Sequence, residues 1–270
     1  MLEFEILARG LYRPDQLVIT YDPALRMPTT PALQEWMDAT WQAKLTLARE
    51  QGFPLFDGQL VRLVSAEAGG DGKLHIVLGN TGYKEYITSR EPAFAQGRDR
   101  QELGNALALC SVVETNDGYI LYERRQKVAV HSGRFHVIAG FFEQRDTDAQ
   151  GQPDPFAAMR REIREETGIQ ADDIVEQYCL GSVYDLSSPH GELCFLTRLN
   201  ISLAEVRTRT PEDQEIQQLL ALPVTSRNLR EFILNNHGNI SATGEPNLLM
   251  YGGLRFGEEW WEEMMREISS

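Results

Sequence analysis

The sequence predicts an α/β protein of 270 residues, and three patterns carry this prediction. Short apolar runs bounded by Gly, Asn and Asp recur along the chain, which is typical of β-strands separated by turns. A charged segment at 155–167 has the start and stop signals of a helix and lies between two series of such runs. A longer amphipathic segment at 31–52 indicates a second helix. Together they predict an N-terminal α+β domain over residues 1–103, an α/β domain over 104–225 and a helical tail over 226–270.

The N-terminal domain is expected to place four strands around one helix. That helix is predicted from Pro31 to Gly52, where the glycine supplies a stop. A GGDGK turn separates the last two strands, and residues 92–104 read as a connection to the next domain. The strands are predicted at 5–9, 16–22, 59–66 and 73–79.

The second domain is expected to hold a denser series of strands that the charged helix interrupts. An NDG turn at 116–118 separates the first two of these strands. The strands are predicted at 105–115, 119–125, 127–131, 135–142, 177–185 and 192–200. Further helices are predicted near 212–221, 226–236 and 258–268.

Composition restricts the partners of this chain. A net charge of −14 and a pI near 4.9 argue against binding to nucleic acid or to an anionic membrane, because both require a basic surface. Cys110, Cys179 and Cys194 are an odd, widely spaced set, which favours reduced thiols and a cytoplasmic protein. The sequence shows neither a signal-peptide pattern nor an apolar run of about 18 residues.

The string RREIREETGIQ at 160–170 carries the strongest chemical signal. On a helix, Glu162, Glu165 and Glu166 fall within an arc of about 100°, where like charges repel one another unless a cation lies between them. Carboxylate oxygens suit a hard divalent ion such as Mg²⁺. A charged outer helix face is the alternative interpretation. Asp154 before Pro155 and the glycine at 168 bound the helix.

The segment R-E-I-R-E-E-T-G-I resembles the second half of the Nudix box, R-E-U-x-E-E-x-G-U, in which U is aliphatic. The resemblance implies an α/β/α sandwich and metal-dependent hydrolysis of a nucleoside diphosphate. The box glycine, Gly140, stands seven residues too far from Arg161, so that Pro153 occupies the place of the family's first glutamate. That glutamate braces the box arginine, and here either Asp154 or Glu143 is expected to take its role.

The same resemblance implies a set of site residues. Glu162, Glu165 and Glu166, with the backbone carbonyl of Ala139, would hold Mg²⁺, or Mn²⁺ in its place. Arg161 would position them. Glu192 in PHGELCFL is expected to join the site from a later strand, although a surface carboxylate is the plainer interpretation. The general base is then either Glu166 or Glu192.

Substrate binding requires cationic and aromatic groups elsewhere. Arg125 follows a strand and Arg134 precedes another, while Tyr83 and Lys84 in TGYKEYITSRE combine a flat ring with a positive charge. Solvent exposure of the arginines and core packing of the tyrosine are the alternatives. His131, His136 and His190 show no metal-ligand spacing, which favours structural or solvated roles.

A looser resemblance covers most of the chain. PLFDGQLVRL and LGNTGYKEYITSRE, followed by the box, are similar to the vertebrate Nudix UDP-glucose pyrophosphatases. This implies cleavage of UDP-glucose or UDP-galactose to UMP and sugar 1-phosphate. ADP-ribose or a related dinucleotide is the alternative substrate, and a catalytically silent domain that binds a nucleotide or a partner is the alternative function. The N-terminal domain would then serve either recognition or a homodimer interface.

Overall fold

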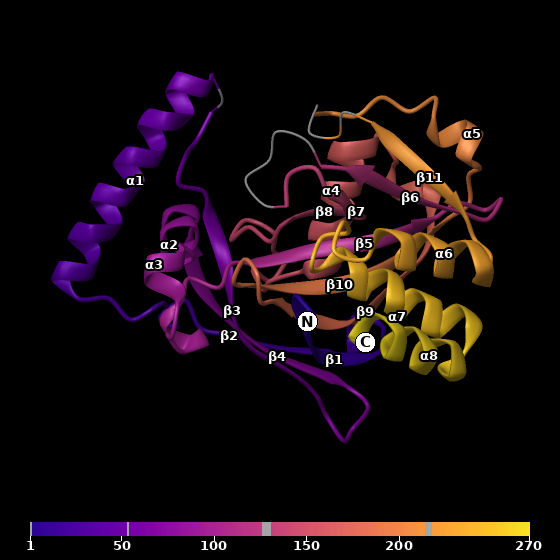
Figure 1. Ribbon diagram of the computed structural model, residues 1–270, viewed down its shortest axis with the longest axis horizontal. Helices are drawn as coiled ribbons and strands as arrows, with labels where there is room; N and C mark the ends of the chain where they lie inside the picture. The colour runs from indigo at the N-terminus through magenta and orange to yellow at the C-terminus, as the bar shows by residue number, and fades with distance from the viewer. Residues whose placement is uncertain (1, 53, 126–130, 214–215, 217) are drawn as a thin grey trace.

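The computed structural model describes residues 2–52, 54–125, 131–213, 216 and 218–270 (Figure 1). It has an eight-stranded main sheet with the order β1-β9-β10-β5-β6-β11, in which β7 also pairs with β6 and β8 with β5. A second sheet has three strands in the order β2-β4-β3. The predicted mixed α/β architecture is therefore confirmed.

The main sheet is mixed. Strand β5 runs parallel to β10, whereas the other strand pairs of this sheet are antiparallel. Its strands are β1 (Phe4–Tyr12), β5 (Leu107–Glu114), β6 (Tyr119–Arg124), β7 (Phe135–His136), β8 (Ile138–Phe141), β9 (Ile174–Asp185), β10 (His190–Leu199) and β11 (Leu219–Pro223). The small sheet contains β2 (Leu17–Tyr21), β3 (Gln59–Ala68) and β4 (Leu74–Gly82).

Helices cover both faces of the main sheet, as in an α/β/α sandwich. Apolar residues of α4 pack on one face, and those of α6, α7 and α8 pack on the other. The α-helices are α1 (Pro31–Gln51), α2 (Tyr83–Ser89), α3 (Pro92–Ala95), α4 (Pro155–Thr167), α5 (Leu203–Val206), α6 (Ser226–Asn236), α7 (Gly244–Phe256) and α8 (Glu258–Ser269). Short 3₁₀ turns lie at Pro14–Gln16, Arg100–Glu102 and Ala171–Asp173. None of the described helices is both long enough and apolar enough to cross a bilayer.

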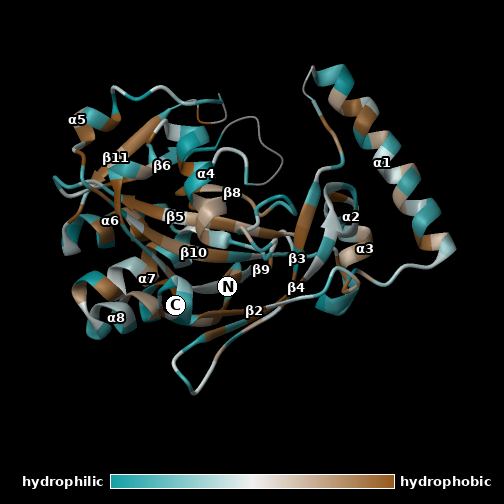
Figure 2. Cartoon of the chain, turned by 180° about the vertical axis from the view of Figure 1, so that it is seen from behind, coloured by the Kyte–Doolittle hydropathy of each residue, from teal (hydrophilic) through white to brown (hydrophobic). Residues whose placement is uncertain are grey.

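The first hundred residues contribute to both sheets. Helix α1 lies at the edge of the molecule beside α2 and α3, away from the main sheet (Figure 1). Its polar and apolar residues alternate along its length (Figure 2). In contrast, β1 pairs with β9 of the main sheet, from Phe4 opposite Asp185 to Tyr12 opposite Cys179. A domain division at residue 103 stays a prediction, and the small sheet with α1–α3 is called the N-terminal unit below.

Helix α4 has the predicted bounds, and its ends show why. The Asp154 carboxylate accepts hydrogen bonds from the amides of Phe156 and Ala157, at 3.0 and 2.9 Å. These bonds satisfy amides that have no partner within the helix. At the other end Gly168 adopts φ +75°, the left-handed conformation that glycine tolerates best. Helices α1, α6 and α8 also lie where the sequence predicts them.

One prediction near the C-terminus is wrong, and one helix there was not predicted. The helix predicted at 212–221 is replaced in its last part by β11, which pairs with β6 from Leu219 opposite Glu123 to Pro223 opposite Tyr119. Residues 214–215 and 217 of that segment lie outside the described residues, as does most of the strand predicted at 127–131. Helix α7 was not predicted, because its buried sequence GEPNLLMYGG has no amphipathic period.

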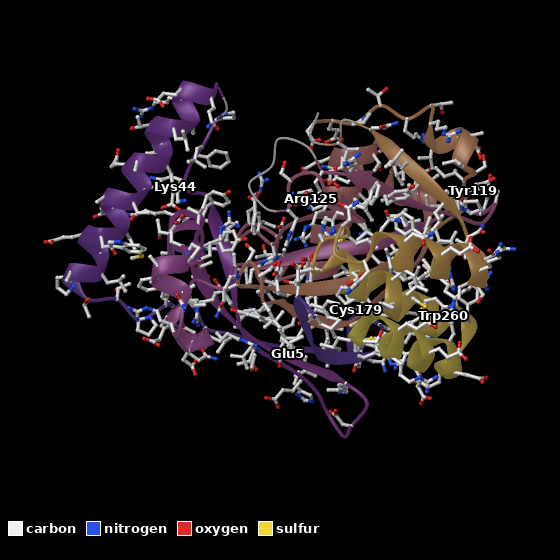
Figure 3. All side chains as sticks on the ribbon, viewed as in Figure 1. Glu5, Lys44, Tyr119, Arg125, Cys179 and Trp260 are labelled. Atoms are coloured by element: carbon white, nitrogen blue, oxygen red, sulfur yellow. The ribbon has the colours of Figure 1, made fainter. Side chains whose placement is uncertain are left out.

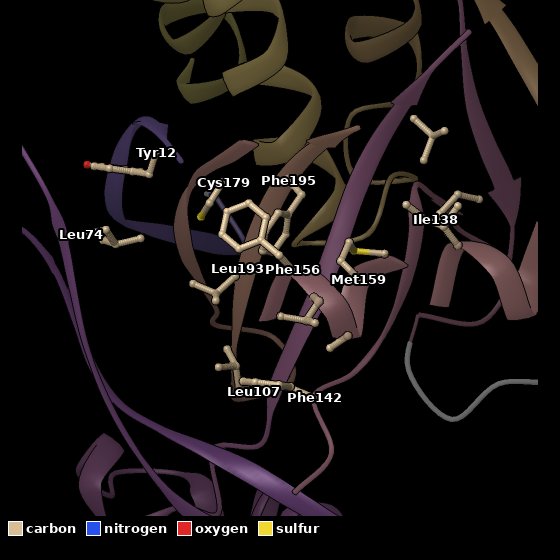
Figure 4. Close-up of a cluster of buried hydrophobic side chains, with 14 of the residues drawn as sticks. Tyr12, Leu74, Leu107, Ile138, Phe142, Phe156, Met159, Cys179, Leu193 and Phe195 are labelled. Atoms are coloured by element: carbon tan, nitrogen blue, oxygen red, sulfur yellow. The ribbon is translucent and has the colours of Figure 1, made fainter. Parts of the chain in front are cut away.

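The hydrophobic core on the α4 face fixes that helix against the sheet (Figure 4). Phe156 of α4 meets Phe195 of β10 edge to face, with ring centroids 5.1 Å apart. Met159 and Ile163, one and two turns further along, are fully buried in the same cluster. Each such side chain contributes about 1.5–3 kcal/mol by leaving water. This packing determines where the polar face of α4 points.

Candidate active site

Arg161 of α4 lies at the centre of a group of carboxylates. Its Nε and Nη2 atoms donate to the two oxygens of Asp146, at 2.9 and 2.8 Å. Its Nη1 lies 2.8 Å from both Glu162 Oε1 and Glu165 Oε2. Burial lowers the pKa of Arg161, but its hydrogen bonds to Asp146 and the nearby acids outweigh burial and raise that pKa. The guanidinium therefore stays charged and holds three acidic side chains in place.

The residue that braces Arg161 is Asp146, so both expected candidates are wrong. Asp154 caps α4, and Glu143 forms an ion pair with Arg145, at 2.7 Å. Asp146 lies in the segment inserted before the helix, and its Oδ2 also accepts the Glu143 amide, at 2.9 Å. The backbone carbonyl of Asp146 accepts the amide of Asp154, which ties the insertion to the helix start. A carboxylate from the inserted loop thus takes the place of the missing glutamate.

Glu162 and Glu166 lie buried against the backbone of β8. A Cβ atom at Gly140 would stand 2.0 Å from the Glu162 carboxyl carbon, so only glycine permits this approach. The Ala139 amide donates to Glu166 Oε2, at 3.3 Å. The box glycine thus provides space for one carboxylate, and the residue before it orients another.

The carboxylate oxygens of this site are the kind of ligand that a hard cation binds. Carboxylate oxygens of Glu162 and Glu166 lie against the backbone of β8, where any side chain at Gly140 would collide with the Glu162 carboxylate. Glu162 and Glu165, however, are turned onto Arg161. Among the described residues, no group of three or more His, Cys, Asp or Glu side chains is arranged to hold a metal ion. Occupation by a cation would therefore require carboxylates to exchange Arg161 for the ion.

Glu192 lies apart from this group, on the sheet face that α7 covers. Its neighbour Leu193 packs in the α4 cluster, whereas Cys194 packs in the α7 cluster, and alternation along the strand places Glu192 with Cys194. Its carboxylate is buried, 3.4 Å from His190 Nε2 and 3.8 Å from His136 Nε2. Burial raises the pKa of Glu192, but the two histidines reverse this and lower it to about 2.

The three histidines belong to this buried network. Burial lowers the pKa of His136 to about 3, which keeps its imidazole neutral. Burial also opposes protonation of His190, but Tyr86, Glu192 and Asp185 together raise its pKa to about 10. His131 Nε2 lies 2.6 Å from Asp185 Oδ2. His136 and His190 are buried and His131 is half-buried, and all three have acidic neighbours.

The predicted substrate-binding residues lie in different places. The Tyr83 ring packs edge-on against Trp41 and Phe141, and Lys84 forms an ion pair with Asp38 of α1. Arg134 pairs with Glu3 and Arg125 lies 4.0 Å from Glu123. Figure 3 shows Arg125 near the centre of the molecule, well away from Lys44 on α1.

The predicted site residues thus separate into groups. Arg161, Glu162, Glu165 and Glu166 come together beside Ala139, whereas Glu192 and the four substrate-binding candidates do not join them. Sequence reasoning missed Asp146. The acidic stretch RDTD in the insertion was the available signal for it, but spacing alone does not predict how an inserted loop closes.

We compared the sequence and the structure with those of known proteins. The sequence profile described as "NUDIX domain" matches residues 104–232. A comparison with curated proteins gave no match.

Several solved structures are similar to this chain at low sequence identity. One is a bifunctional NMN adenylyltransferase/ADP ribose pyrophosphatase from Francisella tularensis, with 15% identity over 63% of this chain and 45% of that chain, at a TM-score of 0.41. Another is a NUDIX hydrolase from Nitrosomonas europaea, with 15% identity over 54% of this chain and 88% of that chain, at a TM-score of 0.34. The chain spans less than half the length of the first of these. The stretch that matches the NUDIX domain profile, residues 104–232, includes the box residues on α4.

Proposed function

We propose that the chain is a divalent-metal-dependent pyrophosphatase that hydrolyses the diphosphate of a nucleoside diphosphate sugar. The preferred substrates are UDP-glucose or UDP-galactose, which would yield UMP and sugar 1-phosphate. The observation that carries the proposal is the group of buried carboxylates on α4, held around Arg161 and against Ala139 and Gly140. Such a concentration of negative charge is costly without a cation, and a site that only binds a neutral partner has no use for it.

Glu162, Glu165 and Glu166 would hold the ion, Mg²⁺ or Mn²⁺, with the Ala139 carbonyl as a further oxygen donor. The ion supplies neutralisation of charge on the phosphate oxygens and polarisation of water. Arg161 and Asp146 contribute by fixing the position of the carboxylates, because the bidentate pair locks the guanidinium in one orientation. The Phe141 carbonyl, which accepts from Arg161 Nη2 at 3.3 Å, ties the same guanidinium to the end of β8.

Hydrolysis needs a group that accepts a proton from the attacking water. Water forms a bond to one phosphorus, the bridging P–O bond breaks, and the leaving phosphate carries away the electron pair. We propose Glu166 as the base, because Glu192 lies on the opposite face of the sheet and its low pKa makes it a poor proton acceptor. The Ala139 amide would orient the Glu166 carboxylate for this role.

The sugar nucleotide assignment is supported by the resemblance of the N-terminal segments, and Lys84 is the residue on which it is tested. Lys84 contacts Asp38, so a role in substrate binding would require it to leave that ion pair. If Lys84 has only a structural role, that role is its ion pair with Asp38. Lys84→Ala and Asp38→Ala would then have the same effect, whereas a substrate-binding lysine gives a higher KM for UDP-glucose in Lys84→Ala alone.

The proposal is tested with a panel of UDP-glucose, UDP-galactose, ADP-ribose and a dinucleotide, each with Mg²⁺ and read for released monophosphate. UDP-sugars should be cleaved fastest. Glu166→Gln and Glu165→Gln should each lower the rate by about a hundredfold or more. Both should weaken Mg²⁺ binding in calorimetry.

Glu143→Gln serves as the control for these variants, because Glu143 pairs with Arg145 and not with Arg161. It should retain activity and metal affinity. Faster cleavage of ADP-ribose would overturn the sugar assignment only. No cleavage of any compound, together with unchanged Mg²⁺ binding in the α4 variants, would leave a silent binding domain.

A further inference from the structure

The segment that follows β8 leaves the main sheet and pairs with the small sheet. The amide of Val61 in β3 donates to the carbonyl of Phe142, at 2.8 Å. Two residues further on, the amide of Gln144 donates to the carbonyl of Gln59, at 3.0 Å. Because β3 is an outer strand of the three-stranded sheet, these bonds cover part of an edge that would otherwise be unpaired.

The side chain of Gln144 adds a second attachment to the same sheet. Its Nε2 donates to the carbonyls of Leu60 in β3 and Thr81 in β4, at 3.0 and 3.2 Å. Leu60 and Thr81 are register partners, so one amide group bridges two strands. The backbone bonds attach the segment to the outer strand only, whereas the side chain also attaches it to the next strand.

The attached segment carries the carboxylate that braces Arg161. Glu143 precedes Gln144, and its amide donates to Asp146 Oδ2, at 2.9 Å. The Asp146 amide in turn donates to the Glu143 carbonyl, at 3.0 Å. This tight turn presents the Asp146 carboxylate to Arg161, which donates to it at 2.9 and 2.8 Å. One residue, Arg145, separates Gln144 from Asp146, so a displacement of Gln144 also displaces the brace.

The small sheet and α4 are held together by one hydrophobic cluster. Val61 and Leu78 of that sheet belong to the cluster that fixes α4 against the main sheet. Phe142 of the attached segment and Met159 of α4 are fully buried in the same cluster (Figure 4). Because a close-packed interior deforms little, a residue tied to the small sheet keeps its position relative to α4.

We propose that Gln144 is a positioning residue for the carboxylates of α4. Its bonds to β3 and β4 hold the turn that presents Asp146 to Arg161. The orientation of Arg161 then determines how strongly it draws Glu162 and Glu165 away from a cation. The N-terminal unit is thereby part of the support of this site. The effect on metal binding rests on the proposed function, whereas the effect on Arg161 does not.

The test compares Gln144→Met with Gln101→Met in the full chain. Methionine is unbranched and flexible like glutamine, but its side chain donates no hydrogen bond. Gln101 is the matched control, because its Nε2 also donates to a carbonyl of β3, that of Val64, at 3.1 Å. It lies in the 3₁₀ turn Arg100–Glu102, outside the segment that carries Asp146.

The first measurement is the solvent exchange of the Arg161 Nε–H proton, followed by ¹⁵N NMR without metal or substrate. The signal is assigned by its absence in Arg161→Lys. Exchange should be at least about fivefold faster in Gln144→Met than in Gln101→Met, because two neutral hydrogen bonds no longer hold the brace. The Arg62 Nε–H, which donates to the Leu103 carbonyl at 3.3 Å, reports general loosening of the fold and should not change.

The second measurement is Mg²⁺ binding by calorimetry. The affinity of Gln144→Met should fall by about five- to tenfold, and that of Gln101→Met should equal the parent's. The rate of Gln144→Met should be reduced at limiting Mg²⁺ and should recover at saturating Mg²⁺, because its metal ligands are intact. A residue that serves only the stability of the fold would not give this recovery.

Faster exchange of Arg161 with weaker Mg²⁺ binding, in Gln144→Met alone, supports the positioning role. Faster exchange in a parent that binds no Mg²⁺ supports the link from Gln144 to Arg161 and contradicts only the proposed function. Equal exchange of Arg161 in the two methionine variants overturns the inference. The same holds if the Arg62 signal accelerates as much as that of Arg161, since Gln144 would then stabilise the fold in general.

Discussion

At the scale of single residues, Asp146 shows how a segment that resembles the NUDIX box tolerates an insertion. The helix register keeps Glu162, Glu165 and Glu166 in place, and the carboxylate that Arg161 needs comes from the inserted loop. What the site requires is a bidentate acceptor at the guanidinium, whatever its position in the sequence. A brace supplied by a loop is as effective as one supplied by a helix only if the loop is itself fixed, and the bonds of Asp146 to Glu143 and Asp154 fix it.

Asp146→Asn should lower activity by about ten- to a hundredfold, because an amide replaces a charged bidentate partner and frees Arg161 to draw Glu162 and Glu165 further toward itself. The affinity of this variant for Mg²⁺, measured by calorimetry, should fall together with its activity. Asp148→Asn is the control. Asp148 caps a turn in the same loop by accepting the amides of Gln150 and Gln152, which an asparagine also does. Equal activity of both variants would remove Asp146 from the site.

At the scale of elements, the sequence predicts α4 accurately because its bounds are local. Asp154, Pro155 and Gly168 act within one turn of their own position.

Segment 219–223 shows the opposite case: its leucines and alanine favour a helix, but pairing with β6 makes it a strand. Helix α7 escapes prediction because Gly252 is needed for contact with another helix, where a Cβ would stand 2.1 Å from the Trp260 ring. Glu192 was misplaced for a similar reason, since a local pattern does not say which sheet face a residue occupies.

The start of α4 gives a stability prediction. Asp154→Ala should lower the free energy of unfolding by about 1 kcal/mol, because the amides of Phe156 and Ala157 lose their acceptor. Asp154→Asn should cost little, since asparagine caps about equally well. Chemical denaturation of the two variants beside the parent measures both. A loss of activity in Asp154→Asn without a loss of stability would show that this carboxylate does more than cap.

The helix ends give a second prediction through a matched pair of glycines. Gly52 ends α1 at φ +74° with open space around a Cβ, whereas a Cβ at Gly168 would stand 2.4 Å from the Thr210 carbonyl oxygen. Gly52→Ala should cost about 1–2 kcal/mol, the strain of a left-handed alanine. Gly168→Ala should cost about 1–3 kcal/mol more, because backbone must also move. Equal midpoints of denaturation for the two variants would contradict the close approach at Thr210.

At the scale of the whole molecule, buried titratable groups between the sheet and its neighbours link stability to pH. His136 has a folded pKa of about 3, so the unfolded chain binds its proton first and stability falls as the pH drops from about 6.5. Glu192, with a folded pKa of about 2, loses its contribution as the pH falls below about 4.5. His190 acts oppositely, because its folded pKa of about 10 means that its contribution is lost as the pH rises from about 6.5.

We therefore expect maximal stability near pH 6.5, with a decline on both sides. Denaturation midpoints measured from pH 4 to pH 10 check this. His190→Gln should flatten the alkaline side relative to the parent while leaving the acid side sloped. A parent curve that is level from pH 7 to pH 10 would show that His190 is neutral in the folded chain.

The pairing of β1 with β9 has a consequence for synthesis on the ribosome. Phe4 emerges first, but its partner Asp185 follows roughly 180 residues later, which is about 10–35 s at usual elongation rates. During that time the segment FEILARGLY lacks β9, the strand with which it pairs. It must be shielded by nascent neighbours or by a chaperone. Slowing translation between β1 and β9 should therefore lower the yield of soluble chain, whereas the same delay placed after β9 should not.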